Sequence, residues 1–215
     1  MIGDCSAEVV SSTVPCSTKW MVGTVNSFYI GIISTAIATA LGTMAALGLS
    51  RPHMPYKPLI MSILISPMIV PLIITAAGMF FFYARINLVY TFTGVILAHV
   101  ALATPFVVIT VTATLVGFDM NMVKAAQSLG AKPMRTFFKV IMPLILPGII
   151  SGALFAFITS FDEVVIVMFM ASLDQLTIPK QMWAGIRQEI SPVILCMATC
   201  LVVLSIFLLT TVELL

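Results

Sequence analysis

Charged residues are scarce in this sequence. Asp, Glu, Lys and Arg make up only 8% of its 215 residues, whereas hydrophobic residues make up 60% and the mean hydropathy is +1.17. Soluble domains carry about 25% charged residues, so this composition excludes an ordinary soluble domain and predicts a membrane protein. The net charge of +2, without any basic stripe, gives no sign of a nucleic acid partner.

Residues suited to catalysis or metal binding are also few. The chain has two histidines, and no spacing of a nucleophile and a base stands out. None of its four cysteines has a histidine near it in the sequence, which argues against a metal site. None of the six lysines follows a glycine, so the P-loop that binds nucleotide phosphates is absent. We therefore expect neither an enzyme nor a cofactor in this chain.

The N-terminal stretch is polar and carries Asp4 and Glu8 in place of the long apolar core of a signal peptide. We expect residues 1–26 to form an external polar leader and residues 27–215 to form a transmembrane domain. A disulfide between Cys5 and Cys16 requires that this leader face an oxidising compartment, and the sequence leaves that question open.

Long apolar runs divide the rest of the chain. A helix needs about 20 mainly apolar residues to cross the ~30 Å hydrocarbon core of a bilayer. Five runs meet this length, which predicts an all-α membrane protein with about five transmembrane helices. The runs cover residues 28–49, 59–83, 90–116, 144–170 and 192–215.

The basic residues between these runs predict the orientation, because loops rich in Lys and Arg stay in the cytoplasm. Six of the ten Lys and Arg residues fall in the loops 51–58 and 117–143, and four fall on the other side of the membrane. We therefore expect both of these loops to be cytoplasmic and the N-terminus to be external.

Small residues recur every four positions in the first apolar run, at Ser34, Ala38, Gly42 and Ala46. Such a ridge lets another helix approach closely, so it predicts a packing surface.

Three prolines and one histidine lie inside the later apolar runs. Pro67, Pro71 and Pro105 each remove a backbone hydrogen bond, and the resulting kinks fit either a transport path or plain packing. His99 has no acid in its own run, which favours an interhelical hydrogen bond over proton transfer.

The loop 117–143 contains the signals of a short helix. Asn121 is a candidate N-cap, residues 122–129 make about two turns, and Gly130 suits the left-handed position that often ends a helix. Pro133 suits the first turn of a following helix. The loop therefore predicts a short helix between two membrane spans.

This loop resembles the EAA loop of the permeases of binding-protein-dependent ABC importers. The positions that carry the resemblance are Lys124, Ala125, Ala126, Gly130, Val140, Met142 and Pro143. The resemblance implies a type I ABC importer permease in the bacterial cytoplasmic (inner) membrane. Its implied partners are a cytoplasmic ABC ATPase that carries the ATP, a second permease subunit, an extracytoplasmic substrate-binding protein and the lipid bilayer. In such permeases the EAA loop forms a coupling helix that docks into a groove on the ATPase.

Two departures from the family follow. Lys124 stands where the family has Glu, and behind an Asn121 cap a lysine at this position cannot close a capping box. In the fold of this family, one further helix precedes the region that corresponds to residue 20 onward in this chain. The chain is therefore expected to lack that first helix, through a late start codon or a truncated gene.

The run 160–169, SFDEVVIVMF, and the run 185–192, GIRQEISP, look most like the spermidine/putrescine permeases, although importers of iron or phosphonate share parts of both. Asp162 and Glu163 are acids flanked by apolar runs, which predicts a place on a cation path. Phe161 beside them is a candidate stacking face, although a role in the core or facing lipid is favoured for it. A structural pairing or a helix cap is the alternative for these acids. An ion-coupled transporter or channel and an inactive truncated fragment are the rival functions.

Overall fold

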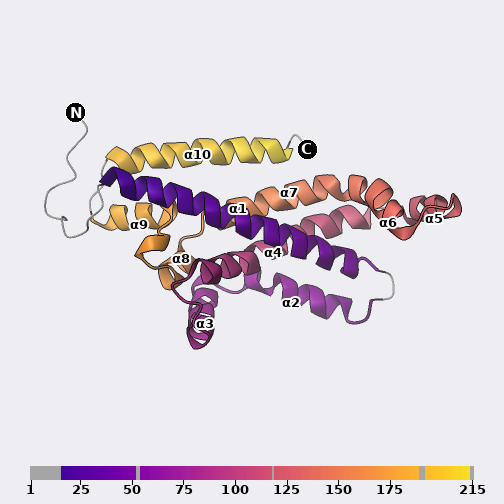
Figure 1. The fold of residues 1–215 in the computed structure, drawn as a ribbon, viewed down its shortest axis with the longest axis horizontal. Coiled ribbons are helices and arrows are strands. Elements are labelled where there is room, and N and C mark those ends of the chain that lie inside the picture. Colours follow the sequence, from indigo (N-terminus) through magenta and orange to yellow (C-terminus); the bar gives the residue numbers. More distant parts are fainter. Residues whose placement is uncertain (1–15, 52–53, 118, 189–191, 214–215) are drawn as a thin grey trace.

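The computed structural model describes residues 16–51, 54–117, 119–188 and 192–213, and within them it contains helices and no strands. Three long helices lie side by side and form the core of the bundle (Figure 1): α1 (Cys16–Leu49), α4 (Phe92–Val116) and α7 (Met142–Phe161). Each is part of a stretch long and apolar enough to cross a membrane, namely Lys19–Leu49, Phe92–Val116 and Pro133–Phe161. The expected membrane protein made of helices is confirmed.

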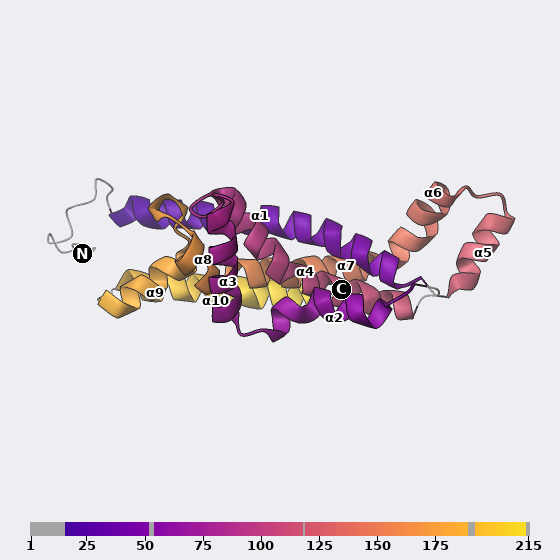
Figure 2. The same ribbon diagram turned by 90° about the horizontal axis from the view of Figure 1, so that it is seen from below.

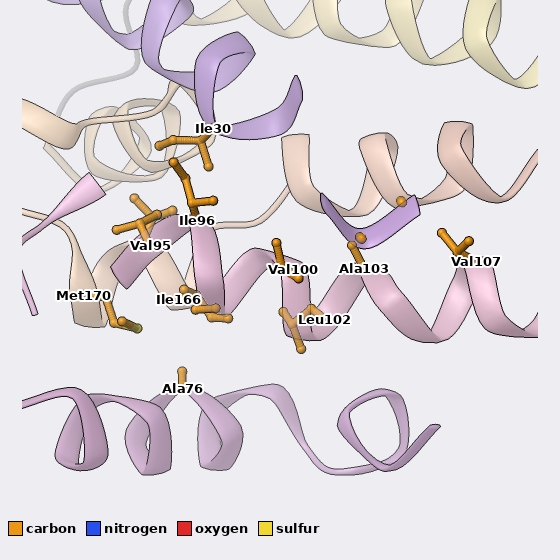
Figure 3. Close-up of a cluster of buried hydrophobic side chains, with 14 of the residues drawn as sticks. Ile30, Ala76, Val95, Ile96, Val100, Leu102, Ala103, Val107, Ile166 and Met170 are labelled. Atoms are coloured by element: carbon orange, nitrogen blue, oxygen red, sulfur yellow. The ribbon is translucent and has the colours of Figure 1, made fainter. Parts of the chain in front are cut away.

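Small residues hold these three helices together. Ser34, Ala38, Gly42 and Ala46 are all buried, so the predicted ridge on α1 is confirmed. A Cβ atom at Gly42 would lie 2.7 Å from Cβ of Val107 on α4, which shows how closely the two backbones approach. Apolar residues of α1, α4 and α8 (Val165–Met170) fill the interior beside this contact, and Ala76 points toward them from α3 (Leu72–Arg85) (Figure 3).

The second apolar run is a broken helix rather than one straight crossing. It consists of α2 (Lys57–Ile69) and α3, which meet at an angle of 103°. Pro71 stands at the junction, where it has no N–H to continue the helix. Figure 1 shows α2 running along the bundle and α3 turning across it.

The fourth apolar run is also not one helix, because α7 ends at Phe161 instead of continuing to Met170. Before this run, α6 (Pro133–Thr136) continues through a π-helical turn, η2 (Phe137–Ile141), into α7. The shorter helix α8 follows. The 3-10 turn η3 (Leu173–Gln175) and α9 (Ile178–Gln188) then lead to α10 (Pro192–Glu213), an apolar helix that packs on α7 and α9.

The described part of the chain begins inside α1, which includes residues 16–26 of the expected polar leader. The Asn26 amide in this part donates to the carbonyls of Asp174 and Leu176 in a distant loop. Cys5 and the side chain of Cys16 lie outside the described part of the chain. Whether the two cysteines form a disulfide therefore stays an open question.

Candidate functional site

The loop 117–143 forms a helical hairpin that projects from one end of the bundle (Figure 2). Its first arm is α5 (Met120–Ser128), and its second arm is α6, with Pro133 in the first turn as predicted. The predicted N-cap is wrong. The cap is Asp119, whose Oδ1 accepts a hydrogen bond from the backbone N–H of Asn121 at 2.9 Å. Both Asp and Asn are good caps, and only the backbone path decides between two candidates so close in sequence.

The corrected cap changes the position of Lys124. With Asp119 as N-cap, Met122 occupies the third helical position and Lys124 the fifth. A glutamate at position 124 would therefore not close a capping box, which joins the cap to the third position. The explanation of the family's Glu as a partner of an Asn121 cap is wrong for this chain.

The end of α5 follows the prediction. Gly130 has a φ of +82°, in the left-handed region that glycine adopts without strain. The N–H of Gly130 donates to the carbonyl of Gln127 at 2.9 Å, and the N–H of Ala131 donates to that of Ala126 at 3.0 Å. This pair of bonds is a Schellman motif, which satisfies the last carbonyls of the helix and turns the chain sharply.

The hairpin presents a mixed surface to the solvent. Lys124, Ala125 and Gly130 are exposed, while Ala126 is half-buried. Leu129 at the tip is 87% exposed, so the end of the hairpin carries an open apolar side chain. Pro143 is not part of this surface, because it lies in the first turn of α7 beyond η2.

The two neighbouring acids Asp162 and Glu163 have different surroundings in the structure. Glu163 is buried, and its Oε1 accepts a hydrogen bond from the N–H of Ile166 at 3.0 Å, which caps α8. Burial raises the pKa of this carboxyl and the neighbouring Asp162 adds to the rise, while the N–H groups of Ile166 and Val165 oppose it. Glu163 thus takes the alternative role of a helix cap.

Phe161 is also engaged within the chain. It is only 8% exposed and packs edge-on against Phe28 of α1, with ring centroids 5.1 Å apart, and it stacks on Phe157, with ring centroids 5.3 Å apart. These contacts make it part of an aromatic cluster between α1 and α7. One edge of the same side chain reaches the cleft described next.

Asp162 lies at a cleft between α7, α9 and α10. The cleft has a volume of about 360 Å³, and among the described residues that line it Asp162 alone is charged. Its apolar walls include Ile158, Met182 and Val202. Desolvation by these surroundings raises the pKa of the Asp162 carboxyl. The arrangement offers one carboxylate to a ligand whose remaining surface is apolar.

Lys180 is a site residue that the sequence did not single out. Its Nζ donates to the carbonyls of Val167 and Ala171, each at 3.2 Å, at the C-terminal end of α8. Partial burial lowers the pKa of its ammonium group. Because Glu163 caps the other end, α8 has a negative side chain at its positive pole and a positive side chain at its negative pole.

Other long-range hydrogen bonds hold the end of the molecule that contains α8. The amide of Gln175 donates to the carbonyl of Tyr90 at 2.8 Å, and the hydroxyl of Ser27 accepts from the N–H of Ile178 at 2.9 Å. Nearby in the bundle, Nδ1 of His99 bonds to the hydroxyl of Ser160 at 2.8 Å, which confirms the expected interhelical contact. These residues pair with positions 61 to 151 residues away, so no local pattern could identify their partners.

The fold and these two regions define a multi-pass membrane permease, with a projecting helical hairpin at one end and a carboxylate cleft toward the other. The chain belongs to the family described as "Binding-protein-dependent transport system inner membrane component", whose model matches residues 21–215. It is therefore the permease subunit of an ABC importer, a transport protein rather than an enzyme.

Two relatives of known name and one solved structure are similar to it. It is 30% identical over 190 residues to the spermidine/putrescine transport system permease protein PotC of Haemophilus influenzae, covering 88% of this chain and 74% of the relative. It is 28% identical to the putrescine transport system permease protein PotI of Escherichia coli, covering 90% and 75%. The permease fold is shared with a chain of the MetNI methionine ABC transporter in an inward-facing conformation, with a TM-score of 0.73, 17% identity and coverage of 94% and 96%.

Proposed function

We propose that this permease imports polyamines such as spermidine or putrescine across the bacterial cytoplasmic membrane. The observation that carries this proposal is the Asp162 carboxylate in a cleft whose other lining residues, apart from Ser205, are apolar. A polyamine is a chain of methylene groups with ammonium groups along it. Its methylenes match the apolar walls, and one ammonium matches the carboxylate. The similarity to PotC and PotI supports the same substrate class.

Transport would be driven from the opposite end by a cytoplasmic ATPase, a separate chain that binds the ATP. α5 is the element suited to dock on it, because the exposed Ala125 beside the half-buried Ala126 allows close approach and Leu129 offers an apolar anchor. Asn121, Lys124, Ala125, Ala126 and Gly130 would form the docking surface, and Pro143 would begin the helix that carries the motion inward. A second permease subunit and an extracytoplasmic binding protein would complete the importer.

The orientation of the chain can be tested by labelling. We expect the loops 51–58 and 117–143 to face the cytoplasm, because they hold most of the basic residues. Cysteine placed at Ser128, on α5, should resist an impermeant thiol reagent in intact cells, whereas cysteine placed at Asp174 should react. Both positions are exposed, so access alone decides the result. The reverse pattern would invert the orientation.

Asp162→Asn is expected to lower the efficiency of polyamine uptake about tenfold, since the charge-assisted contact it removes is worth about 1.5 kcal/mol. The variant should still assemble and hydrolyse ATP, because Asp162 is exposed and only borders the cleft. Uptake of radiolabelled putrescine and spermidine into proteoliposomes measures the effect.

Glu163→Gln is the matched control for this prediction. Glutamine can still accept the hydrogen bond from the N–H of Ile166, so α8 stays capped and uptake should remain near the native level. Native uptake by Asp162→Asn would remove Asp162 from the path. A native complex that transports only anionic or neutral solutes would contradict the polyamine assignment.

A further inference from the structure

The helix α9 lies at the end of the molecule opposite the hairpin, and one of its faces is open (Figure 2). On that face Trp183 is 46% exposed, Ile186 is 55% exposed, and Arg187 is exposed as well. The last two follow Trp183 by three and four residues, so the three side chains share one side of the helix. The other side is held by the chain itself, because the Gln181 amide donates to the carbonyl of Lys19 at 2.7 Å. The open face presents two apolar side chains and one cation to its surroundings.

The depth of this face in the membrane follows from α10. That helix is apolar and has 22 residues, so it is about 33 Å long, close to the ~30 Å thickness of the hydrocarbon core. Its first turn, from Pro192, therefore stands at one boundary of the core. A Cβ atom at Gly185 would lie 2.5 Å from Cδ1 of Ile194, so the last turn of α9 packs directly against this first turn. Ile186 and Arg187 consequently lie where hydrocarbon gives way to lipid headgroups.

The guanidinium group of Arg187 has hydrogen-bond donors to offer at this depth. Its central carbon lies 5.6 Å from the centroid of the Trp183 ring, in a cation–π contact. In the part of the chain that the structure describes, no oxygen accepts a hydrogen bond from this guanidinium and no carboxylate forms an ion pair with it. Phosphate oxygens accept pairs of guanidinium N–H groups in short charge-assisted hydrogen bonds. The cation is therefore suited to a phosphate group outside the chain.

The two apolar neighbours favour a phospholipid as the source of that phosphate. Tryptophan is enriched at membrane–water interfaces, because its ring has an apolar body and one N–H donor. Ile186 has no polar atom in its side chain, and it lies beside Arg187 on the same face. A phospholipid joins a phosphate to acyl chains within one molecule, so it matches a cation next to apolar side chains. A free phosphate ion would leave the apolar part of the face uncovered.

We propose that Trp183, Ile186 and Arg187 bind one phospholipid of the leaflet at this end of the bundle. The phosphate would contact Arg187, and the upper part of the acyl chains would contact the other two side chains. The site does not depend on which solute is transported. Met182, which precedes Trp183 in the sequence, lines the Asp162 cleft, so the bound lipid would hold one wall of that cleft in place.

Spin labelling of Ile186→Cys tests the depth of the face. The assembled importer, with its native cysteines replaced by serine, is placed in nanodiscs of phosphatidylglycerol. We expect the label to be accessible to both dissolved oxygen and a water-soluble nickel chelate, to a degree between two references. Asp174→Cys, exposed in the loop before α9, is the aqueous reference, and Val203→Cys, 61% exposed in the middle of α10, is the hydrocarbon reference.

Three results at Ile186→Cys would overturn the lipid site. Accessibility equal to that of Asp174→Cys would place the face in water. Accessibility equal to that of Val203→Cys would place it too deep for a phosphate. Protection from both oxygen and the nickel chelate would show that a partner chain, such as the binding protein or a second permease subunit, covers the face.

Native mass spectrometry of the assembled importer tests the role of the cation. We expect Arg187→Gln to lower the affinity for phosphatidylglycerol about tenfold, because it removes the charge-assisted hydrogen bonds. Arg187→Lys keeps the charge but not the paired donors, so its loss should be smaller. Arg85→Gln is the matched control, since Arg85 is an exposed cation in the last turn of α3. Its affinity should stay near native.

A galactolipid with the same acyl chains but no phosphate separates the phosphate contact from the apolar ones. We expect it to bind the native importer and Arg187→Gln equally. Equal retention of phosphatidylglycerol by these two proteins would refute the site. An equal loss in Arg85→Gln would show that general surface charge, and not this face, attracts the lipid. Binding of inorganic phosphate as tight as that of phosphatidylglycerol would contradict the acyl-chain contacts.

Discussion

Gly148→Val is expected to prevent the permease from accumulating as a folded protein. Gly148 lies on α7 against α4, where a Cβ atom would overlap Oγ1 of Thr114 and lie 3.2 Å from the carbonyl oxygen of Thr110. The threonine side chain could rotate away, but the backbone oxygen belongs to a buried helix and cannot. Overpacking of this kind costs about 1–3 kcal/mol, and a branched side chain enlarges the overlap.

Thermal unfolding of the detergent-solubilised protein, followed by size-exclusion chromatography, measures this effect. Gly78→Val is the matched control, because a Cβ atom at Gly78 on α3 meets nothing within 4 Å. We expect a markedly lower unfolding temperature, or no folded protein, for the first variant and a nearly native temperature for the second. Equal unfolding temperatures would contradict the close packing of α4 and α7.

Gly130→Val is expected to abolish transport while the membrane helices still fold. The φ of +82° at this position costs a residue with a side chain about 1–2 kcal/mol, and more if it is β-branched. The Schellman motif would open and the direction of α5 would change. ATP hydrolysis stimulated by the loaded binding protein should therefore fall together with uptake, because the hairpin would no longer fit the ATPase.

Gly130→Asn separates the backbone effect from the loss of glycine, since asparagine tolerates the left-handed conformation better than other residues do. This variant should retain most of the stimulated ATP hydrolysis. If Gly130→Val supports uptake at the native rate, the end of α5 does not take part in coupling.

The sequence predicted the features that depend on local composition. The apolar runs located the bundle helices, the four-residue spacing of Ser34 to Ala46 located the contact with α4, and Gly130 located the end of α5. Each of these signals is a property of residues close together in the chain. The sequence predicted the break at Pro71 only in part, because a proline indicates a kink but not the angle of that kink.

The features that were missed depend on distant contacts or on a choice between similar residues. Asp119 and Asn121 are both suitable caps, and the path of the backbone decides between them. Asp162 and Glu163 are adjacent and chemically alike, yet one borders a cleft and the other caps α8. The role of Lys180 depends on carbonyls that only the fold brings within reach.

The continuity of α6, η2 and α7 has a mechanical consequence. These elements form a single stretch of 29 residues from the hairpin to Phe161, about 44 Å long. A lever of this length converts a tilt of about 5° at the hairpin into a displacement of about 4 Å at the far end, next to Glu163, whose side chain caps α8. The hydrogen bond between Glu163 and Ile166 is 3.0 Å long and would be lost beyond about 3.5 Å, so a relative movement much smaller than this displacement breaks it. A small angular movement at one membrane surface is thus enough to force α8 either to travel with the lever or to lose its cap.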